Sequence, residues 1–342
     1  MNATLQCLAN IKKISEYFIN LRKDKKFTDN NKYKLSKEYS SILNRLYFSE
    51  ENKKYIAPYE FRKIIAEMNP YFRLGDFMHP KKILIFLIEH LHSELNKTEE
   101  TNLSIIMPDN INTTNQQQVF QCFTGEFKKK YNSIISKYFY GTSTSMTLCH
   151  WCNKSKYSFQ FFSFIIFPLL KVKNFRNNLV SCGILPQKVL SQPLNIQDCF
   201  NYYQKEEFYE SENQKYCDIC KQLRNTSMCT QIYSAPLVLI LLLDRGRNME
   251  IKENIIFLEE INMNNYIKYK IPDNTYFLSG IITYVGQRGQ VPHFMAFCRM
   301  SKDSKWYFYN DAVVNESNFN EINNNNNKGK PYILFYQKII ME

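Results

Sequence analysis

Long apolar runs, a secretory leader and dense runs of basic residues are all missing from this chain of 342 residues. Its two longest apolar stretches, Phe159–Leu170 and Ala235–Leu243, are too short to cross a bilayer as helices. Polar Asn2 and Thr4 follow Met1, so the start lacks the charged and apolar regions of a signal peptide. We therefore expect an intracellular protein of the reducing cytoplasm or nucleus and no membrane partner.

Glycine and proline are also scarce, with 9 and 11 copies, which argues against a fibrous or linker-like chain. Hydrophobic residues make up 44%, with 26 Phe and 24 Tyr, enough to build a folded core. The net charge of +12 could indicate an anionic partner such as nucleic acid. The tightest basic cluster is only Lys128–Lys130, which favours a solvated Lys- and Asn-rich surface instead.

Apolar residues recur at helical spacing over most of the first hundred residues. Asn2–Leu46, Pro58–Met68 and Pro80–Leu95 are predicted helical, and Pro80 suits a first helical turn. Polar, Asn-rich Thr101–Gln118 is predicted to be a loop or linker.

After this loop the pattern changes to short aromatic and β-branched segments bounded by turn residues, which predict strands. These segments are Tyr157–Phe167, Leu237–Leu243, Phe277–Val285, His293–Arg299, Lys305–Tyr309 and Tyr332–Gln337. Helices first and strands later indicate an α+β fold. The low-complexity run Asn323–Asn327 is predicted to be a disordered surface loop.

Two Cys-x-x-Cys pairs, Cys149/Cys152 and Cys217/Cys220, give the sharpest chemical signal. One such pair could be chance or a redox motif, but two supply the four thiolates of a tetrahedral structural zinc site. Such a site has no open coordination position, so we assign it no catalytic role. The other six cysteines are expected to be small residues, mostly buried.

A histidine stands at the entrance of one predicted strand and an Asn-Asp pair at the end of the next. If these strands form a hairpin, His293 could adjoin Asn310 and Asp311. An imidazole held by Asn or Asp is the orienting half of a Cys-His-Asn/Asp triad. A single histidine near an aspartate is more often structural, so the residues alone leave both interpretations open.

This stretch resembles the histidine box of the ubiquitin-specific proteases, and further segments match that family in the same order. The matching segments are Met1–Leu8, the two cysteine pairs, Ala235–Arg245, Tyr276–Val285, Pro292–Phe297, Trp306–Val314 and Pro331–Tyr336. The resemblance covers nearly the whole chain.

The resemblance implies a papain-like cysteine proteinase fold with a helical thumb (residues 1–118), zinc-ribbon fingers (119–235) and a β-sheet palm (236–342). It implies thiol-dependent hydrolysis of isopeptide bonds at the C-terminus of ubiquitin, by a deubiquitinase that acts as a monomer. His293 would be the general base, Asn310 its orienting partner and Asp311 the adjacent acidic residue. Structural zinc would be held by Cys149, Cys152, Cys217 and Cys220.

The chain also departs from the family pattern. In the family the nucleophilic cysteine lies two residues before the methionine that matches Met1, and an oxyanion-hole asparagine lies further upstream. Cys7 is predicted to be a buried, inert thiol on the first helix and no substitute. Pro292 replaces a glycine, and His79–Leu84 replaces a Gln-rich acidic box, so ubiquitin contacts there are in question. The remaining histidines, His79, His90, His92 and His150, are expected to be structural or surface residues.

Three hypotheses follow. The chain could derive from an active deubiquitinase whose reading frame begins upstream of Met1, which sequencing the 5′ end of the transcript would decide. It could instead be a ubiquitin-binding pseudoenzyme. The zinc knuckles and the charge of +12 could also mark a nucleic-acid binder, which ranks last because no basic stripe lies among the knuckles.

Overall fold

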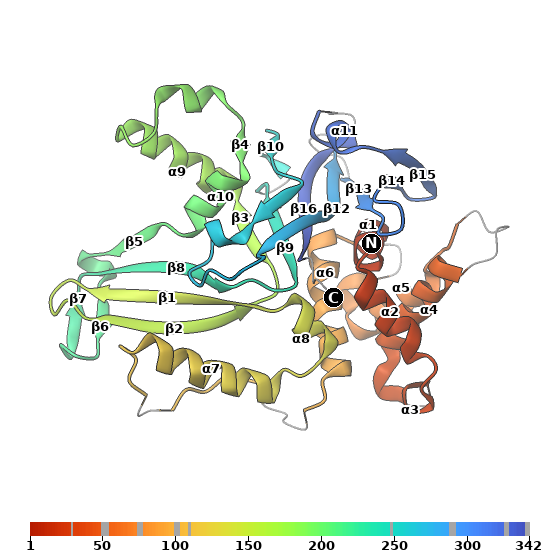
Figure 1. The fold of residues 1–342 in the computed structure, drawn as a ribbon, viewed down its shortest axis with the longest axis horizontal. Coiled ribbons are helices and arrows are strands. Elements are labelled where there is room, and N and C mark those ends of the chain that lie inside the picture. Colours follow the sequence, from red (N-terminus) through yellow and green to blue (C-terminus); the bar gives the residue numbers. More distant parts are fainter. Residues whose placement is uncertain are drawn as a thin grey trace.

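A computed structural model gives the arrangement of the chain, and it resembles an open hand (Figure 1). The structure describes residues 1–28, 30–48, 55–73, 78–98, 103–108, 111–246, 249–286, 292–324 and 328–338. Among these residues, no helix is both long enough and apolar enough to cross a membrane.

The described residues of the N-terminal part are mostly helical, as the periodicity predicts. The helices are α1 (Asn2–Ala9), α2 (Lys12–Leu21), α3 (Lys25–Thr28), α4 (Lys34–Phe48), α5 (Tyr59–Met68) and α6 (Pro80–Leu95). The bounds of α6 agree with the prediction, and Pro80 opens its first turn. Glu94 near the end of α6 is buried and accepts hydrogen bonds from the backbone N–H groups of Leu35 and Ser36, which ties α6 to the start of α4.

The predicted loop Thr101–Gln118 is wrong at its end, because α7 (Gln116–Lys130) begins inside it. The Asn115 side chain accepts a hydrogen bond from the backbone N–H of Gln118 and caps this helix. The described residues before it, 103–108 and 111–115, have no regular helix or strand. A second short helix, α8 (Ile134–Phe139), follows.

The finger sheet projects away from helices α1–α6 (Figure 1) and has the strand order β2-β1-β8-β5. Its strands are β1 (Gly141–Cys149), β2 (Ser155–Phe162), β5 (Glu206–Tyr209) and β8 (Thr226–Ser234). Helix α7 covers one face through a small cluster of Val119, Phe123, Phe159 and Tyr233. At the far end, β6 (Lys215–Cys217) and β7 (Gln222–Arg224) form a separate hairpin.

The palm is an eight-stranded sheet with the order β15-β14-β13-β12-β16-β9-β3, and β11 pairs with β12 beside this path. Its strands are β3 (Ile165–Pro168), β9 (Val238–Asp244), β11 (Glu260–Asn262), β12 (Thr275–Val285), β13 (His293–Arg299), β14 (Trp306–Asn310), β15 (Val313–Ser317) and β16 (Lys330–Lys338). The bounds of β13 agree with the prediction. Six residues of β9 are buried in succession, as expected for a strand covered on both faces.

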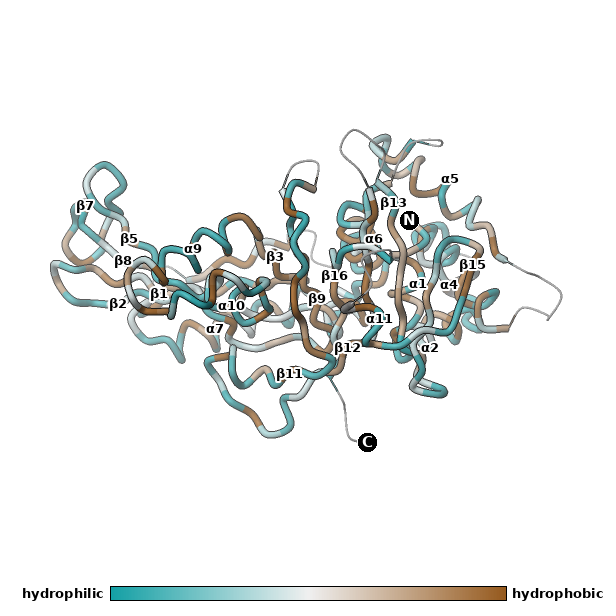
Figure 2. Tube along the Cα trace, turned by 90° about the horizontal axis from the view of Figure 1, so that it is seen from above, coloured by the Kyte–Doolittle hydropathy of each residue, from teal (hydrophilic) through white to brown (hydrophobic). Residues whose placement is uncertain are grey.

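Two core clusters lie on opposite faces of the palm sheet. One joins α1, α2, α4 and α6 to side chains such as Ile240, Ile282 and Phe335. The other packs α9 (Leu169–Ser181) and α10 (Ile196–Tyr203) against alternating residues such as Leu241 and Leu334. Hydrophobic residues gather around β3 and β9, and the finger end near β7 is mostly hydrophilic (Figure 2).

The predicted strand Tyr157–Phe167 is two strands, β2 in the finger sheet and β3 in the palm. The chain leaves the fingers after Phe162 and adds β3, α9 and α10 to the palm before it returns through β5. Of the predicted loop Asn323–Asn327, the first two residues end helix α11 (Phe319–Asn324), and the other three lie outside the described residues.

Candidate active site and metal centre

The predicted His/Asn pair comes together at the junction of helices and palm. His293 begins β13, and β13 pairs antiparallel with β14 so that Ala296 faces Tyr309. Continuing this register places Asn310 opposite Met295, two residues from His293 and on the same face of the sheet. The side chains of His293 and Asn310 are therefore diagonal neighbours, and His293 Nε2 lies 2.7 Å from Asn310 Oδ1.

This contact fixes the tautomer of the imidazole. An amide oxygen can only accept a hydrogen bond, so Nε2 of His293 carries the proton and donates it to Asn310. In the neutral ring Nδ1 is then the acceptor, which is the form that a general base requires.

Asp311 forms the third part of the site. Asp311 and Ala312 make the two-residue loop between β14 and β15, in which Asp311 has a left-handed φ of 51°. Aspartate tolerates this conformation better than most residues do. The loop brings the Asp311 carboxylate to the start of α1, where it accepts a 2.7 Å hydrogen bond from Asn2 Nδ2. The hairpin thereby connects the helical part to the palm beside the His/Asn pair.

A cavity of about 220 Å³ opens at this junction. It is lined by Met1, Asn2, Arg62, Met78, His293, Phe294 and Asp311. Sequence analysis did not single out Arg62 or Met78, because they come from α5 and the segment before α6 and belong to no motif. None of the cysteines, all of which the structure describes, lines this cavity.

Cys7 is buried, as predicted, and lies away from the His/Asn pair. Its Sγ is 4.0 Å from the Sγ of buried Cys298, and burial raises the pKa of the Cys7 thiol well above its ordinary value. Cys298 stands five residues along β13 from His293, which at about 3.4 Å per residue is roughly 17 Å. Cys7 therefore cannot act as the partner of His293.

His79 packs beside the site, which agrees with the structural or surface role that the sequence suggested. Its ring packs edge-on against Phe294 and Tyr332, with centroids 5.4 and 5.5 Å away. Burial lowers the pKa of His79 to about 4, and the positive charges of nearby Lys81 and Lys82 contribute less to this shift. The ring is therefore neutral at physiological pH.

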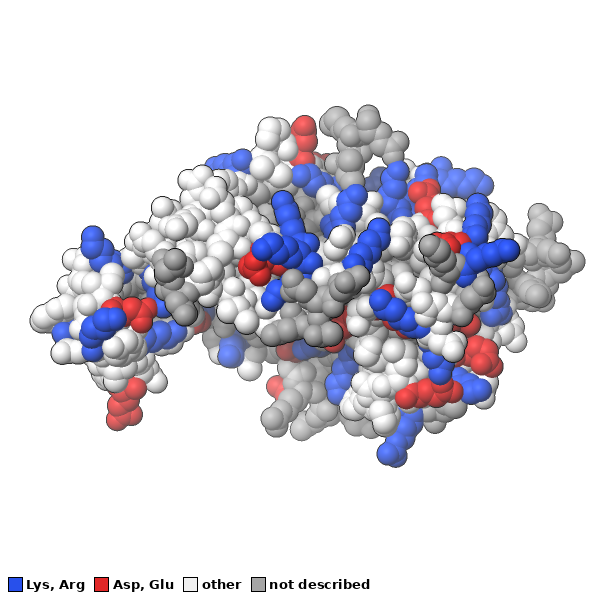
Figure 3. Space-filling model, turned by 90° about the horizontal axis from the view of Figure 1, so that it is seen from below, with Lys and Arg blue, Asp and Glu red and all other residues white. Residues whose placement is uncertain are grey.

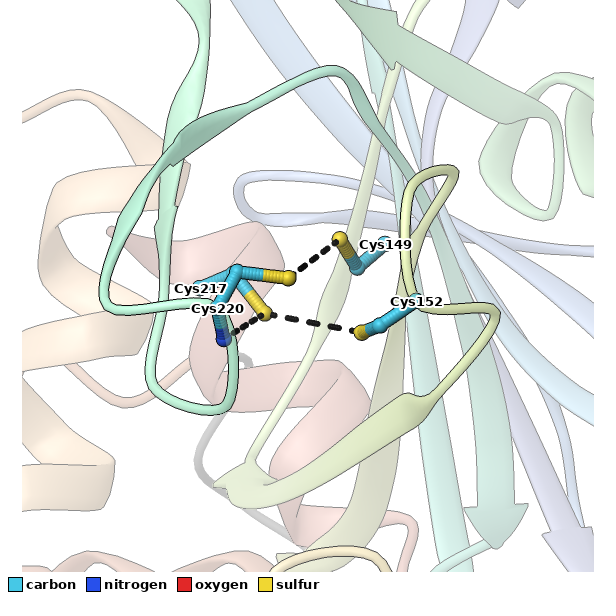
Figure 4. Close-up of side chains that lie close together, drawn as sticks. All are labelled: Cys149, Cys152, Cys217 and Cys220. Carbon is cyan, nitrogen blue, oxygen red and sulfur yellow. Dashed lines mark hydrogen bonds between the residues drawn. The ribbon is translucent and has the colours of Figure 1, made fainter.

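The two cysteine pairs converge at the far end of the fingers (Figure 4). Cys149 Sγ lies 4.0 Å from Cys220 Sγ, and Cys152 Sγ lies 3.8 Å from Cys217 Sγ. All four sulfurs lie within 4.8 Å of one another. A zinc ion with Zn–S bonds of about 2.3 Å sets neighbouring sulfurs about 3.8 Å apart, so the site fits a four-cysteine zinc centre.

Both cysteine pairs use the same turn. The residue after each pair, Asn153 or Lys221, has φ of 54°, and its backbone N–H donates to the carbonyl of the first cysteine. In the second knuckle the backbone N–H of Cys220 donates to Cys217 Sγ and lowers the pKa of that thiol to about 7. Such turns leave sulfurs pointing inward as metal ligands.

A helical part and a β part meet at a paired His and Asn, which is the orienting half of a Cys-His-Asn triad, and a projecting sheet carries a four-cysteine cluster. Comparison with known proteins identifies the family. Residues 1–336 match the family model described as ubiquitin carboxyl-terminal hydrolase. The chain belongs to this family, which confirms the recognition of a ubiquitin-specific protease catalytic domain.

Human ubiquitin carboxyl-terminal hydrolase 21 is 23% identical over 98% of this chain and 59% of its own length. Human ubiquitin carboxyl-terminal hydrolase 2 is 21% identical over 98% of this chain and 53% of its own length. The chain thus spans a little over half the length of these relatives.

The fold also resembles a solved structure, titled the SAGA Ubp8/Sgf11/Sus1/Sgf73 DUB module bound to ubiquitin aldehyde. The TM-score is 0.68 and the identity 19%, over all of this chain and 68% of the other. This match confirms the predicted α+β, ubiquitin-specific protease fold.

Proposed function

We propose that this chain is the catalytic domain of a deubiquitinase, which binds ubiquitin and acts on isopeptide bonds at the ubiquitin C-terminus. The observation that carries the proposal is the 2.7 Å contact between His293 and Asn310 at the start of α1, in a chain of this family. The two human relatives are ubiquitin carboxyl-terminal hydrolases by name, and the similar structure was bound to ubiquitin aldehyde.

In this proposal residues 1–118 are the thumb, 119–235 the fingers and 236–342 the palm, with β3, α9 and α10 contributed to the palm from the finger segment. Ubiquitin rests against fingers and palm, and its C-terminal glycines reach His293 between thumb and palm. The family likeness and the position of the 220 Å³ cavity at this junction support the placement.

His293 acts as the general base through Nδ1, and Asn310 holds its ring by accepting from Nε2. Asp311 positions the start of α1 through Asn2. A thiol placed at the N-terminal end of α1 would give up its proton to His293 and attack the carbonyl of the last glycine. The same histidine would then return the proton to the leaving lysine amine.

We further propose that Cys149, Cys152, Cys217 and Cys220 hold structural zinc, which fixes the fingers that contact ubiquitin. A four-thiolate metal site suits a reducing compartment, so we place the chain in the cytoplasm or nucleus. Basic and acidic side chains are interspersed over the face shown in Figure 3, which favours a solvated surface over a nucleic-acid site.

A second candidate is a ubiquitin-binding chain without hydrolytic activity. It is favoured by the cavity beside His293, whose described lining contains no cysteine. The two candidates differ only in the thiol. Sequencing the 5′ end of the transcript shows whether a cysteine codon lies upstream of Met1, and the following test shows whether the site can use such a thiol.

The test compares the 342-residue chain with a version extended so that a cysteine stands two residues before Met1. Calorimetric titration should show ubiquitin binding by both. Only the extended chain should form a covalent adduct with ubiquitin that carries a C-terminal electrophile. His293→Ala should slow the adduct about 10²–10⁴-fold, because general-base catalysis contributes that much.

A serine in place of the added cysteine is the matched control and should give no adduct. An adduct that forms equally fast with His293→Ala would remove the role of His293. Absence of ubiquitin binding by either version would remove the proposed function. Adduct formation by the unextended 342-residue chain would show that one of its own cysteines serves as nucleophile.

A further inference from the structure

A second and larger cleft adjoins the catalytic cavity. Its volume is about 700 Å³, and its walls come from α1, α4, the segment before α5 and strands β13–β15. Its lining is mostly apolar and includes Leu5, Ile42, Leu46, Pro58, Met300 and Val314. This size and polarity suit a bound chain segment or ligand better than bulk water.

The cleft adjoins the catalytic cavity, because the hydrogen-bonded side chains of Asn2 and Asp311 line both. Its lining elements α4 and β15 lie on the opposite side of α1 from the fingers (Figure 1). A group bound in this cleft would therefore lie next to the site of the His/Asn pair, on the side away from the fingers.

One wall of the cleft is an open sheet edge. Strand β15 is the last strand of the palm sheet, and β14 is its pairing partner among the described strands. Its residues Val313 and Val314 are 53% and 50% exposed, and Val314 faces the cleft. An unpaired edge beside an apolar cleft is the arrangement that accepts an extended peptide as an added strand.

We propose that this cleft binds the acceptor side of the substrate, an extended segment of the ubiquitylated protein with apolar side chains next to the modified lysine. The inference rests on the proposed function, since it takes ubiquitin to approach from the fingers. The ubiquitin tail then ends at His293, and the acceptor lysine and its neighbours must continue on the other side. The cleft and the β15 edge stand on that side.

The test measures binding, so it needs no catalytic thiol. Ubiquitin is joined through its C-terminus to the lysine of a short peptide, in one conjugate flanked by leucine and valine and in another by serine and glutamate. The dissociation constant of each conjugate is compared with that of ubiquitin alone. The apolar conjugate should bind about tenfold more tightly, since burying one or two aliphatic side chains supplies that gain, and the polar conjugate should match ubiquitin.

Two neighbouring variants localise the effect. Val314→Glu places a charge in the cleft and should abolish the gain of the apolar conjugate. Val313→Glu adds the same charge to the same exposed edge strand at a residue outside the cleft lining, and should preserve the gain. Both positions are half exposed, so neither variant disturbs the core.

Ubiquitin binding without any gain for the apolar conjugate would overturn the inference and leave the proposed function in place. Failure of ubiquitin itself to bind would remove the proposed function, and this inference with it. Equal weakening of free ubiquitin by Val314→Glu would assign the cleft to ubiquitin and overturn the inference. A concentration-dependent dimer that dissociates in Val314→Glu would show that a second copy of the chain occupies the cleft. This result would likewise overturn the inference. If the apolar conjugate no longer bound more tightly than ubiquitin to an N-terminally extended chain, the chain would be filling its own cleft. This result would also overturn the inference.

Discussion

Removing the metal from the proposed zinc centre should unfold the end of the fingers and leave the palm folded. The reason lies in how little apolar surface this end buries. Trp151, Ile219 and Leu223 are 71%, 55% and 59% exposed, and β6 and β7 pair only with each other. An isolated two-stranded hairpin is marginally stable at best in water. Structural zinc contributes about 10–16 kcal/mol in small zinc domains, so the ion would supply nearly all the stability of this part.

Hydrogen exchange followed by mass spectrometry measures the effect by region. Cys217→Ser removes one ligand, and the amides of residues 215–224 should lose protection and exchange at rates near those of an unfolded chain. The amides of β12 and β16 should keep theirs, since both palm faces have their own core clusters. Metal analysis should give about one zinc per chain before the change and little after it.

Cys182→Ser is the matched control, because Cys182 is an exposed thiol beyond the metal cluster. It should change neither zinc content nor exchange. Full protection of residues 215–224 in Cys217→Ser would refute the reasoning, as would equal loss of protection in the palm. The first result would mean that packing holds the knuckles, and the second that fingers and palm unfold as one unit.

Two further predictions concern the helical part. Burial lowers the pKa of His92 to about 4, so the unfolded state takes up its proton first as pH falls below the ordinary value of 6.5. The stability that neutral His92 permits is complete above pH 6.5 and declines towards pH 4, by roughly 3 kcal/mol. His92→Asn should flatten this decline in urea unfolding curves, while His90→Gln on the same helix should not; identical curves would contradict the burial argument. Glu94→Gln leaves one of the N–H groups of Leu35 and Ser36 without its acceptor. It should lower the free energy of unfolding by about 1–3 kcal/mol, seen as a lower urea midpoint at constant slope. An unchanged midpoint would count against the contact.

Much of the fold follows from local pattern. The apolar spacing of residues 80–95 and the proline at its start predict α6 with the bounds observed. The short aromatic segment that begins at His293 and is bounded by turn residues predicts β13 equally well. The sequence was less informative where local signals conflict, as at Asn115, whose capping side chain starts a helix inside a segment that its composition predicts to be a loop.

The split of Tyr157–Phe167 shows a different limit. Both halves read as strand, and only pairing tells that β2 joins the fingers while β3 lies beside β9 in the palm. A single sequence carries strand propensity but not strand partners, because partners are chosen by long-range packing.

The sequence by itself determined which chemical groups are present and how they are spaced: two thiol pairs, a histidine opening one strand, and an Asn-Asp pair closing the next. Tertiary structure alone decided what these groups meet. The antiparallel register of β13 and β14 set His293 Nε2 against Asn310, and the left-handed turn at Asp311 carried its carboxylate to α1. The cleft behind α1 is likewise invisible in the sequence, because its walls come from segments up to about 300 residues apart that no local pattern relates.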